Sequence, residues 1–546
     1  MLNNNKTLFG FTIGPIYEMM SHSKKTRELW LSSFFFSWYV KRFYEELTET
    51  LGVEILSPYY DPKQPPPKSK AGLFPDHIVG GSDQTPDKCL NMLKEINKKN
   101  SEFFIDEIDS LGSGKYLSGK SKTNVETTFK DYLQTSFVVL PVTGIEKKKI
   151  IETIDNHLDA LERNRSFTLG KNEDTCYRCK ALPSVFTITD NYDKKLKEQK
   201  VCPFCFLKFK SNESDKISTE SAQPKQFRYR STGEISAYEL LKNVNENELK
   251  KYDEISFESN TKEGKAFKEL IKGIKVEDYH KYMAIVVADG DNLGKIANNV
   301  DDPQIFSQKL FEFGQKAAEI TKQFHGEPVY LGGDDLLTFM PTAYTEDNSI
   351  FTVLKYIQAL STTYSDKLKE INQNGTVSFG VHLFYYKAPL TAALDETHKL
   401  LYEAKSEPGK NSIVLLLTQH SGQQVKIKFN LNSTLLTNFS DLLKGLLSGT
   451  IKYPEGIHHN LSRFKTLLTN LTAPNQLDAF MENRFNEDIH KEYETGIKQV
   501  FKMLKEMLTD KTNGSLHVYN GVQAVNLFDE FLSQIKFIKF LAGDKS

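Results

Sequence analysis

Two adjacent aspartates at the tip of a predicted hairpin are the feature that most limits how this chain can fold. In PVYLGGDDLLTFMP, residues 328–341, two strand-like apolar runs flank Gly332, Gly333, Asp334 and Asp335. Adjacent carboxylates repel each other and gain nothing from packing in apolar surroundings. Their presence between two strands therefore indicates a turn that serves a ligand.

Apolar periodicity around this hairpin predicts the order of its neighbours. A buried-type strand is expected over 283–288, a helix over 303–324, a second helix over about 349–371, and then a strand at TVSFGVHLFYY. With the hairpin, these segments give the order βαββαβ, a ferredoxin-like split βαβ. In that topology the first strand lies beside the hairpin, so their carboxylates approach each other.

The first of these strands ends in an acidic sequence of its own, DGD. We predict that Asp289, Asp334 and Asp335 are catalytic and hold two hard divalent cations, Mg²⁺ or Mn²⁺. A chance match in a polar turn is the alternative, and the acidic strand end at the right place argues against it. Glycines allow a tight turn and leave room for a triphosphate. The residues expected to contact the nucleotide here are Gly290, Asp291, Gly332 and Gly333.

Four of the five cysteines form two CxxC pairs, Cys176 with Cys179 and Cys202 with Cys205, with 22 residues between the pairs. Thiolates two residues apart on a tight turn can face one ion, and two such turns complete a tetrahedral zinc site. Two disulfides or a redox CxxC are alternatives, but nothing else in the sequence indicates an oxidising compartment. We predict a structural zinc knuckle, and an ordinary buried thiol at Cys89.

Composition limits location and partners. The chain has 546 residues, a net charge of −1 and 39% hydrophobic residues. It has no apolar run of about 18 residues, so no membrane partner is expected. Its start lacks the layout of a secretory signal, and we expect a cytoplasmic protein. The near-neutral charge argues against coating nucleic acid alone, so any RNA or DNA should be held locally or by partner subunits.

Shifts in pattern predict an α+β multidomain protein. The expected segments are a strand-and-helix domain at 1–170, the four-cysteine knuckle at 171–210, a polar linker and helical segment at 211–275, the GGDD domain at 276–420 and a helical domain at 421–546.

The segment LDETHKLLYEAKSEPGKNSIVLL, residues 394–416, resembles the closing segment of diguanylate cyclase domains. The matching residues are Ala404-Lys405 and Gly409-Lys410-Asn411. The resemblance implies that Lys405 and Lys410 contact the phosphates of a nucleotide. A solvated basic helix end is the alternative. Bacterial diguanylate cyclases have Glu-Phe after Gly-Gly-Asp, whereas this chain has Asp335-Leu336, which indicates a different family.

The opening FTIGPIYEMMSHSKKTRELWLSSFFFSWY, residues 11–39, resembles the large subunit of type III-B (Cmr) CRISPR effector complexes, with the run KTRELW at residues 25–30. The knuckle, the DGD and GGDD palm and the helical end follow in the order of that family. The resemblance implies a first ferredoxin-like palm domain that lacks the metal aspartates and a second that is active. GGSD, residues 80–83, is a candidate for a degraded copy of the hairpin.

The resemblance also implies a function. Such subunits sit in a complex with other Cmr subunits, a CRISPR guide RNA and target RNA. On target binding, the palm uses ATP to make a second messenger, either cyclic oligoadenylate or AMP joined to S-adenosylmethionine. One cation would be held by Asp289 and Asp334 and a second shared with Asp335, while Lys405 and Lys410 steady the departing pyrophosphate.

Three other expectations remain. Many relatives carry a nuclease domain with an adjacent His-Asp pair. None of the 12 histidines here is followed by Asp, so no such DNase is expected. A non-catalytic scaffold or RNA-binding subunit is one alternative function, although a palm without activity should lose its carboxylates. A free-standing cyclic-dinucleotide synthase is the other, and the knuckle and first palm-like domain argue against it.

Overall fold

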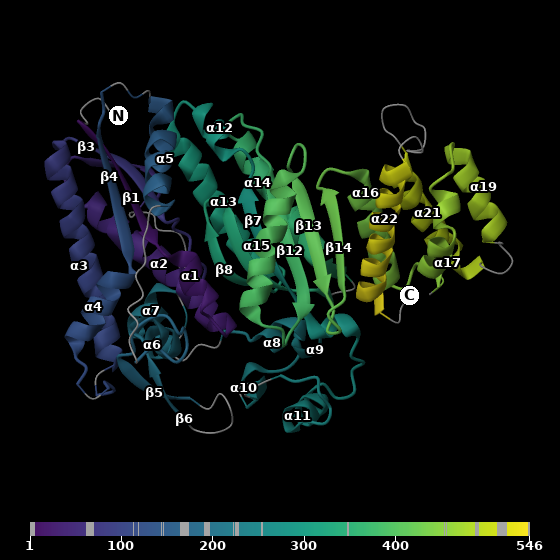
Figure 1. Ribbon diagram of the computed structural model, residues 1–546, viewed down its shortest axis with the longest axis horizontal. Coiled ribbons are helices and arrows are strands. Elements are labelled where there is room, and N and C mark those ends of the chain that lie inside the picture. Colours follow the sequence, from purple (N-terminus) through teal and green to yellow (C-terminus); the bar gives the residue numbers. More distant parts are fainter. Residues whose placement is uncertain are drawn as a thin grey trace.

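The computed structural model describes residues 6–543 apart from 62–69, 113, 118, 144, 146, 164–173, 191–196, 222, 224–228, 250, 253–254, 347–348, 453, 455, 486–490 and 510–520. Parts of the expected knuckle (171–173 and 191–196) and of the expected linker (222, 224–228, 250 and 253–254) therefore lie outside the described residues. Figure 1 shows two sheets side by side, with a group of helices at the C-terminal end of the molecule.

The first sheet has four antiparallel strands in the order β2-β3-β1-β4. Helix α5 packs on one face, and α2 and α3 pack on the other. The bounds are β1 Thr7–Gly14, α1 Ile16–Ser21, α2 Thr26–Thr48, β2 Val53–Ser57, β3 His77–Ser82, α3 Pro86–Gly112, α4 Lys122–Tyr132, β4 Gln134–Pro141 and α5 Ile150–Arg163.

The second sheet has six strands in the order β14-β13-β12-β7-β9-β8. Its four strands β12-β7-β9-β8 are antiparallel and follow the order expected of a βαββαβ unit. The bounds are β7 Tyr282–Gly290, α12 Leu293–Asn298, α13 Pro303–Gln323, β8 Glu327–Gly332, β9 Asp335–Pro341, β10 Ala343–Glu346, β11 Ser349–Thr352, α14 Val353–Lys369, β12 Val377–Tyr385, α15 Leu390–Ser406, β13 Ser412–Thr418 and β14 Gln424–Asn430.

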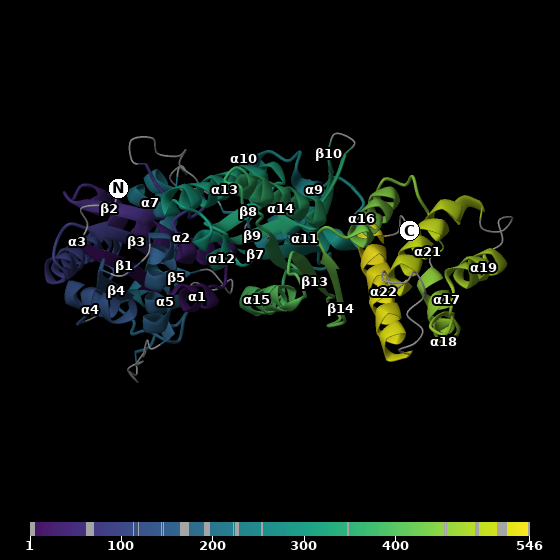
Figure 2. The ribbon, with the colours of Figure 1, turned by 90° about the horizontal axis from the view of Figure 1, so that it is seen from above.

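Local sequence explains why these elements form. Strand β7 is apolar and buried on both faces as far as Ala288, and only its end is acidic. Helix α13 begins at Pro303, and the Asp302 side chain accepts a hydrogen bond from the Gln304 N–H at 3.1 Å. Helices α13 and α14 cover one face of the sheet, and α15 covers the other (Figure 2).

Strand β14 pairs with β13 although it lies beyond residue 420, where the palm was expected to end. In QVKIKFN every second residue is buried, which is the signature of a strand with one solvent face. Helix α22 packs against this strand. The sheet thus reaches residue 430 before the helical region begins.

The remaining elements are mostly helical. They are β5 Phe186–Asp190, β6 Lys197–Val201, α6 Pro203–Lys210, α7 Asp215–Glu220, α8 Thr232–Ser236, α9 Tyr238–Leu241, α10 Glu246–Leu249, α11 Lys262–Leu270, α16 Thr434–Leu447, α17 Ile457–Arg463, α18 Lys465–Leu468, α19 Pro474–Arg484, α21 Glu494–Leu508 and α22 Gly521–Ala542. None of the helices in the described part of the chain combines the length and apolarity needed to cross a bilayer.

The two sheets are joined by helix α2 and by the connection between β2 and β3. Helix α2 packs on β8, the edge strand of the second sheet. The N–H of Leu331 donates to the carbonyl of Gly72 at 3.0 Å, so the connection pairs with that edge. Trp30 of α2 stacks on Tyr229 with ring centroids 5.5 Å apart. The hairpin at the end of β8 therefore faces the first domain.

GGSD does not occupy the place expected of a degraded hairpin tip. Gly80, Gly81 and Ser82 lie inside β3 and pair with β1. In the second sheet the aspartates lie where the third strand of the unit begins, and the equivalent place in the first sheet is Asp76-His77. The GGSD hypothesis was therefore wrong, because a four-letter match carries no information on register.

Candidate functional site

The GGDD segment forms the tight turn between β8 and β9. Gly332 pairs with Asp335 across the hairpin, which leaves Gly333 and Asp334 at its tip. Gly333 has a φ of +66°, a conformation that residues with a Cβ rarely adopt. An added Cβ at Gly333 would meet no atom within 4 Å, so the backbone conformation and not crowding requires glycine there.

The structure brings Asp289, Asp334 and Asp335 together. Strand β7 ends beside the start of β9, with Ala288 opposite Leu336, so Asp289 lies next to the hairpin. One carboxylate oxygen from each of the three residues lies within 4.8 Å of the other two. Three carboxylates at this spacing match the hard oxygen ligands that Mg²⁺ and Mn²⁺ prefer.

Lys405 offsets only part of the repulsion between the three carboxylates of the triad. Burial raises the pKa of Asp334 to about 7, and the charge of Asp289 adds to the shift. Removal from solvent also raises the pKa of Asp335, followed by repulsion from Asp334 and Asp289, although Asp335 keeps an exposed edge. A bound cation would relieve this repulsion, so the donor set fits a divalent metal.

Lys405 supplies a positive charge to the triad from the last turn of α15. Its Nζ donates a hydrogen bond to Oδ2 of Asp289. The lysine borders the same cavity as Asp289 and Asp335, whereas Lys410 borders neither of the two cavities beside the triad among the described residues. Lys410 lies in a turn with a φ of +53°.

Asp291 lies behind the triad in a structural role. It is 1% exposed, and its carboxylate accepts hydrogen bonds from the hydroxyls of Thr376 and Ser378, each at 2.8 Å. The N–H of Asn411 donates to the same carboxylate at 2.9 Å. Asp291 thus anchors the Gly409-Lys410-Asn411 turn to the end of β7 instead of facing a cavity.

Two cavities meet at the hairpin. One has a volume of about 330 Å³ and lies among α1, α2, α15 and the start of β9. The other has a volume of about 290 Å³ and lies between the hairpin and the first domain. Asp76, Tyr330 and Asp335 border both. The triad therefore stands at a junction that is large enough for two small ligands side by side.

The first cavity is largely apolar and aromatic apart from the acidic end. Tyr17 of α1 and Tyr402 of α15 lie at its edge with 46% and 74% of their surface exposed. The ring of His398 meets that of Tyr17 edge-on, with centroids 5.1 Å apart. Nε2 of His398 is buried and has no hydrogen-bond partner among the described residues. Burial lowers the pKa of His398, so its imidazole is neutral.

His77 forms an ion-paired cluster on the wall of the second cavity. Its Nδ1 lies 3.1 Å from Oδ1 of Asp155, and its Nε2 lies 3.3 Å from Oε1 of Glu162, both on α5. Burial alone would lower the pKa of His77, but the hydrogen bonds to these carboxylates, with the charge of Asp76, raise it to about 11. The imidazolium therefore ties β3 to α5 at neutral pH.

This ion pair predicts a pH-dependent stability. The pKa of His77 is raised in the folded state, so its contribution is complete below about pH 6.5 and is lost as the pH rises toward 11. Between pH 7 and 9.5 the wild type should lose stability relative to His77→Gln by up to about 1 kcal/mol per pH unit. Chemical denaturation at several pH values measures this difference. His157→Gln, an exposed change on α5, the helix that carries both partners of His77, should keep the wild-type slope. A pH-independent difference for His77→Gln would contradict the assignment.

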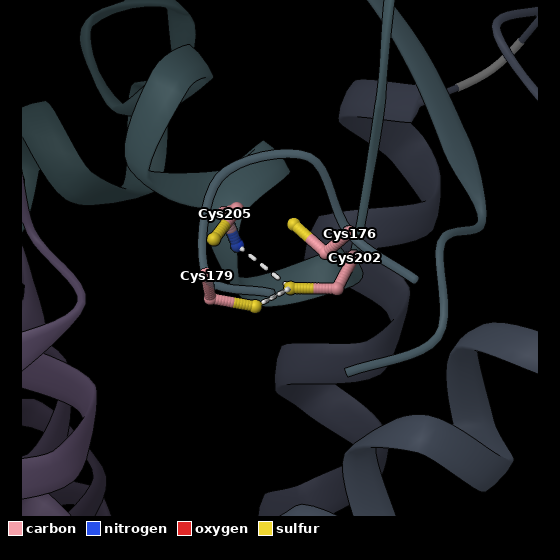
Figure 3. A group of neighbouring side chains, drawn as sticks. All are labelled: Cys176, Cys179, Cys202 and Cys205. Carbon is pink, nitrogen blue, oxygen red and sulfur yellow. Dashed lines mark hydrogen bonds between the residues drawn. The ribbon is translucent and has the colours of Figure 1, made fainter. Parts of the chain in front are cut away.

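The four paired cysteines converge on one point (Figure 3). All four are buried, none forms a disulfide, and one sulfur from each lies within 4.8 Å of the others. Sγ of Cys179 lies 3.9 Å from Sγ of Cys202, and the N–H of Cys205 donates to Sγ of Cys202 at 3.4 Å. Hydrogen bonds from the other thiols hold the pKa of Cys176 well below its ordinary value. The set fits a four-thiolate metal site.

The two cysteine turns are built differently. The first closes with Lys180 in the left-handed region, at a φ of +58°, and its N–H donates to the carbonyl of Cys176 at 3.0 Å. In the second, Cys202 caps α6 and Pro203 occupies its first position. Phe204 of α6 stacks on Phe129 of α4, with centroids 5.4 Å apart. The knuckle therefore packs into the first domain.

Two family models match the chain, and they match it on both sides of this knuckle. The model described as CRISPR-associated protein Cmr2, N-terminal, matches residues 8–85. The model described as Cas10/Cmr2, second palm domain, matches residues 282–414, which include the triad and Lys405. The chain belongs to the Cas10/Cmr2 family. The resemblance noted in the sequence is confirmed at that level.

Individual relatives of this Cas10/Cmr2 chain are distant. It is 27% identical over 223 residues to the CRISPR system Cmr subunit Cmr2 of Pyrococcus furiosus, an alignment that covers 36% of this chain and 24% of that relative. The chain thus spans about a quarter of the length of the curated relative it matches.

Two solved structures share the fold. One is the type III-B Cmr-beta complex in the apo state, with 14% identity, a TM-score of 0.59 and coverage of 86% of this chain and 76% of that chain. The other is the type III-B Cmr-beta complex bound to cognate target RNA, with 12% identity, a TM-score of 0.60 and coverage of 88% and 78%. The mixed α/β architecture with a Cas10 palm is therefore the fold of this chain.

Proposed function

We propose that this chain is the large subunit of a type III-B CRISPR complex that uses ATP to make a nucleotide second messenger when target RNA binds. The observation that carries the proposal is the triad of Asp289, Asp334 and Asp335, with Lys405 beside it, at the junction of two cavities. Its partners would be other Cmr subunits, a guide RNA and target RNA, in keeping with the complex of similar fold that binds cognate target RNA.

The domains that we propose keep the bounds expected from the sequence. Residues 1–170 form a first ferredoxin-like palm without metal aspartates, and its strand order β2-β3-β1-β4 matches the order β8-β9-β7-β12 within the second sheet. The knuckle of 171–210 and the linker of 211–275 lead to the catalytic palm, which was expected over 276–420 and to which β14 adds a strand. A helical region then follows to residue 546.

Each part of the site has a distinct task. Bound divalent cations would supply an activated attacking hydroxyl and charge neutralisation at the triphosphate. Asp289, Asp334 and Asp335 would hold them, and Lys405 would compensate the negative charge of the phosphates as a point charge. The open space beside Gly333 lets a triphosphate approach the hairpin backbone. The new bond forms at the α-phosphorus of ATP as pyrophosphate leaves.

The apolar cavity suits the base of a nucleotide. Exposed aromatic rings such as Tyr17 and Tyr402 provide stacking surfaces for a purine. The neutral imidazole of His398 offers a buried polar contact that the described residues do not satisfy. The second cavity, lined by Asp76 and Asp334, would take the co-substrate, either a second ATP or S-adenosylmethionine.

Product analysis tests the proposal. The chain should be assembled with companion Cmr subunits, guide RNA and complementary target RNA, and then given ATP with and without S-adenosylmethionine. Mass spectrometry should detect cyclic oligoadenylate or an AMP adduct of S-adenosylmethionine, formed only with target RNA. An assembled complex that binds target RNA and makes neither product would favour the scaffold role.

The four cysteines would hold Zn²⁺, which supplies folding free energy and takes no part in the reaction. The knuckle contacts helices of the first domain, and none of its described residues lines the two cavities beside the triad. Arg178 within the CxxC turn pairs with Glu28 of α2, both with less than a tenth of the side chain exposed. Loss of the ion should therefore affect synthesis only through the packing of α2.

A further inference from the structure

Tyr364 of α14 is buried next to the triad, and its hydroxyl stabilises no other described part of the fold through a hydrogen bond. The residue is 0% exposed, and its ring packs edge-on against Phe313 with centroids 5.0 Å apart. The hydroxyl oxygen has no hydrogen-bond partner among the described residues. An unpaired buried hydroxyl is costly, and phenylalanine would fill the same space without that cost.

The hydroxyl lies against the hairpin through the gap that Gly290 leaves. A Cβ added to Gly290 would lie 2.5 Å from the Tyr364 hydroxyl oxygen and 2.8 Å from Oδ2 of Asp334. The hydroxyl and the carboxylate thus flank one small space at the end of β7. A side chain at position 290 would occupy that space. Glycine is therefore required there because the Tyr364 hydroxyl and the Asp334 carboxylate both approach its Cα closely.

The hydroxyl can only act as a donor there. Burial, followed by the charges of Asp334 and Asp289, raises the pKa of Tyr364 well above its ordinary value, so the phenol keeps its proton. The groups that face it are carboxylates, which accept hydrogen bonds and do not donate them when ionised. The second torsion of an aspartate is soft, so Asp334 can turn toward the hydroxyl at little cost.

We propose that Tyr364 is a positioning residue, whose hydroxyl donates to the Asp334 carboxylate when a divalent cation occupies the triad. Metal ligands in proteins are commonly held in orientation by a hydrogen bond to a neighbouring donor or acceptor. The hydrogen bond would leave one oxygen of Asp334 directed at the cation. The inference rests on the proposed function, because it presupposes that the triad binds metal.

Tyr356 provides a matched control on the same helix. It lies eight residues before Tyr364 and is also 0% exposed. Its hydroxyl is satisfied, at 2.9 Å from Oγ1 of Thr321 and 3.2 Å from Oγ1 of Thr338. Removing this hydroxyl takes one hydrogen bond from each of the two threonines, although Thr321 keeps its bond to the Ala317 carbonyl. Removing the Tyr364 hydroxyl breaks no hydrogen bond among the described residues. Tyr364→Phe should therefore lower metal affinity and not stability, whereas Tyr356→Phe should lower stability and not metal affinity.

The test measures Mn²⁺ binding and thermal stability of the purified full-length chain without ATP. Tyr364→Phe should weaken Mn²⁺ affinity by about tenfold, as loss of an orienting partner does, with an unchanged or higher melting temperature. Tyr356→Phe should lower the melting temperature and leave Mn²⁺ affinity unchanged. Electron paramagnetic resonance of free Mn²⁺ gives the affinities.

The outcomes separate this inference from the proposed function. If the wild type binds Mn²⁺ at the triad and Tyr364→Phe binds it equally well, Tyr364 has no positioning role. If Tyr364→Phe loses both Mn²⁺ affinity and thermal stability, the effect is structural and the inference is overturned. The same conclusion follows if Tyr356→Phe also loses Mn²⁺ affinity. If the wild type shows no Mn²⁺ binding that depends on Asp334, the metal site itself is contradicted.

Discussion

Replacing Asp334 and Asp335 together with asparagine is expected to lower nucleotide synthesis by about a thousandfold or more, since removing one preorganised electrostatic group already costs 10²–10³ in rate. Asparagine keeps the size of each side chain and removes the charge that holds the cations. The repulsion that raises the pKa of both residues also disappears, so the melting temperature should not fall. Release of pyrophosphate from ATP by the assembled, target-bound complex measures the loss.

Asp301→Asn is the matched control for this experiment. Asp301 is exposed and lies in the same domain, between α12 and α13, outside both cavities beside the triad. It should leave the rate unchanged. Guide and target RNA binding should be the same in all variants, because the change is confined to the hairpin. Synthesis by the double variant at the wild-type rate would show that the triad is not the active site.

Replacing Cys176 with serine is expected to release the bound zinc and to lower the free energy of unfolding by more than about 4 kcal/mol, the range in which loss of a metal site falls. Three thiolates and a hydroxyl hold Zn²⁺ poorly, and a structural site contributes its binding free energy to folding. The cluster is buried within the main core, so its collapse would also disturb the aromatic packing around Phe204. Zinc content and denaturant midpoints give the two quantities.

Cys89→Ala controls for the loss of any buried thiol. Cys89 is 0% exposed on α3 and lies outside the cluster of four. Its replacement should leave zinc content unchanged and cost about 1 kcal/mol, as small cavities do. If wild-type protein purified without chelators holds no zinc, or if both substitutions destabilise equally, the four cysteines are not a structural metal site.

Most residues of the candidate site could be predicted from short local patterns in the sequence. Asp289, Asp334 and Asp335 could be placed together because strand periodicity predicts the order βαββαβ, and that order predicts which strand ends meet. The four cysteines could be grouped because CxxC spacing constrains two ligands at a time. Both inferences use patterns of a few residues whose geometry is determined by the backbone.

The residues that the sequence could not reveal reach the site through tertiary packing. Asp76 and Tyr330 border both cavities only because the β2–β3 connection pairs with the edge of β8. Tyr364 is one of two buried tyrosines on α14, and nothing in the local sequence distinguishes it from the other, Tyr356. Asp291 belongs to the DGD motif but turns inward to Thr376. Spacing along the chain carries no signal for such contacts.

The features that the sequence did not show beyond the site have a related cause. Strand β14, which lies past the expected end of the palm at residue 420, was not predicted because its single polar-apolar alternation is weak beside the helical pattern that follows. The ion pairs of His77 could not be predicted either, because its partners Asp155 and Glu162 lie on α5, far along the chain. The periodicity of a sequence does not predict the long-range contacts of a single residue.

An anomalous difference map of the full-length chain, crystallised with Mn²⁺ and an ATP analogue that cannot release pyrophosphate, tests the metal-nucleotide site most directly. We expect manganese peaks bounded by Asp289, Asp334 and Asp335, with the triphosphate oxygens completing their coordination and Lys405 turned toward the phosphates. An ordered nucleotide bound elsewhere, with no manganese at the three aspartates, would contradict this expectation.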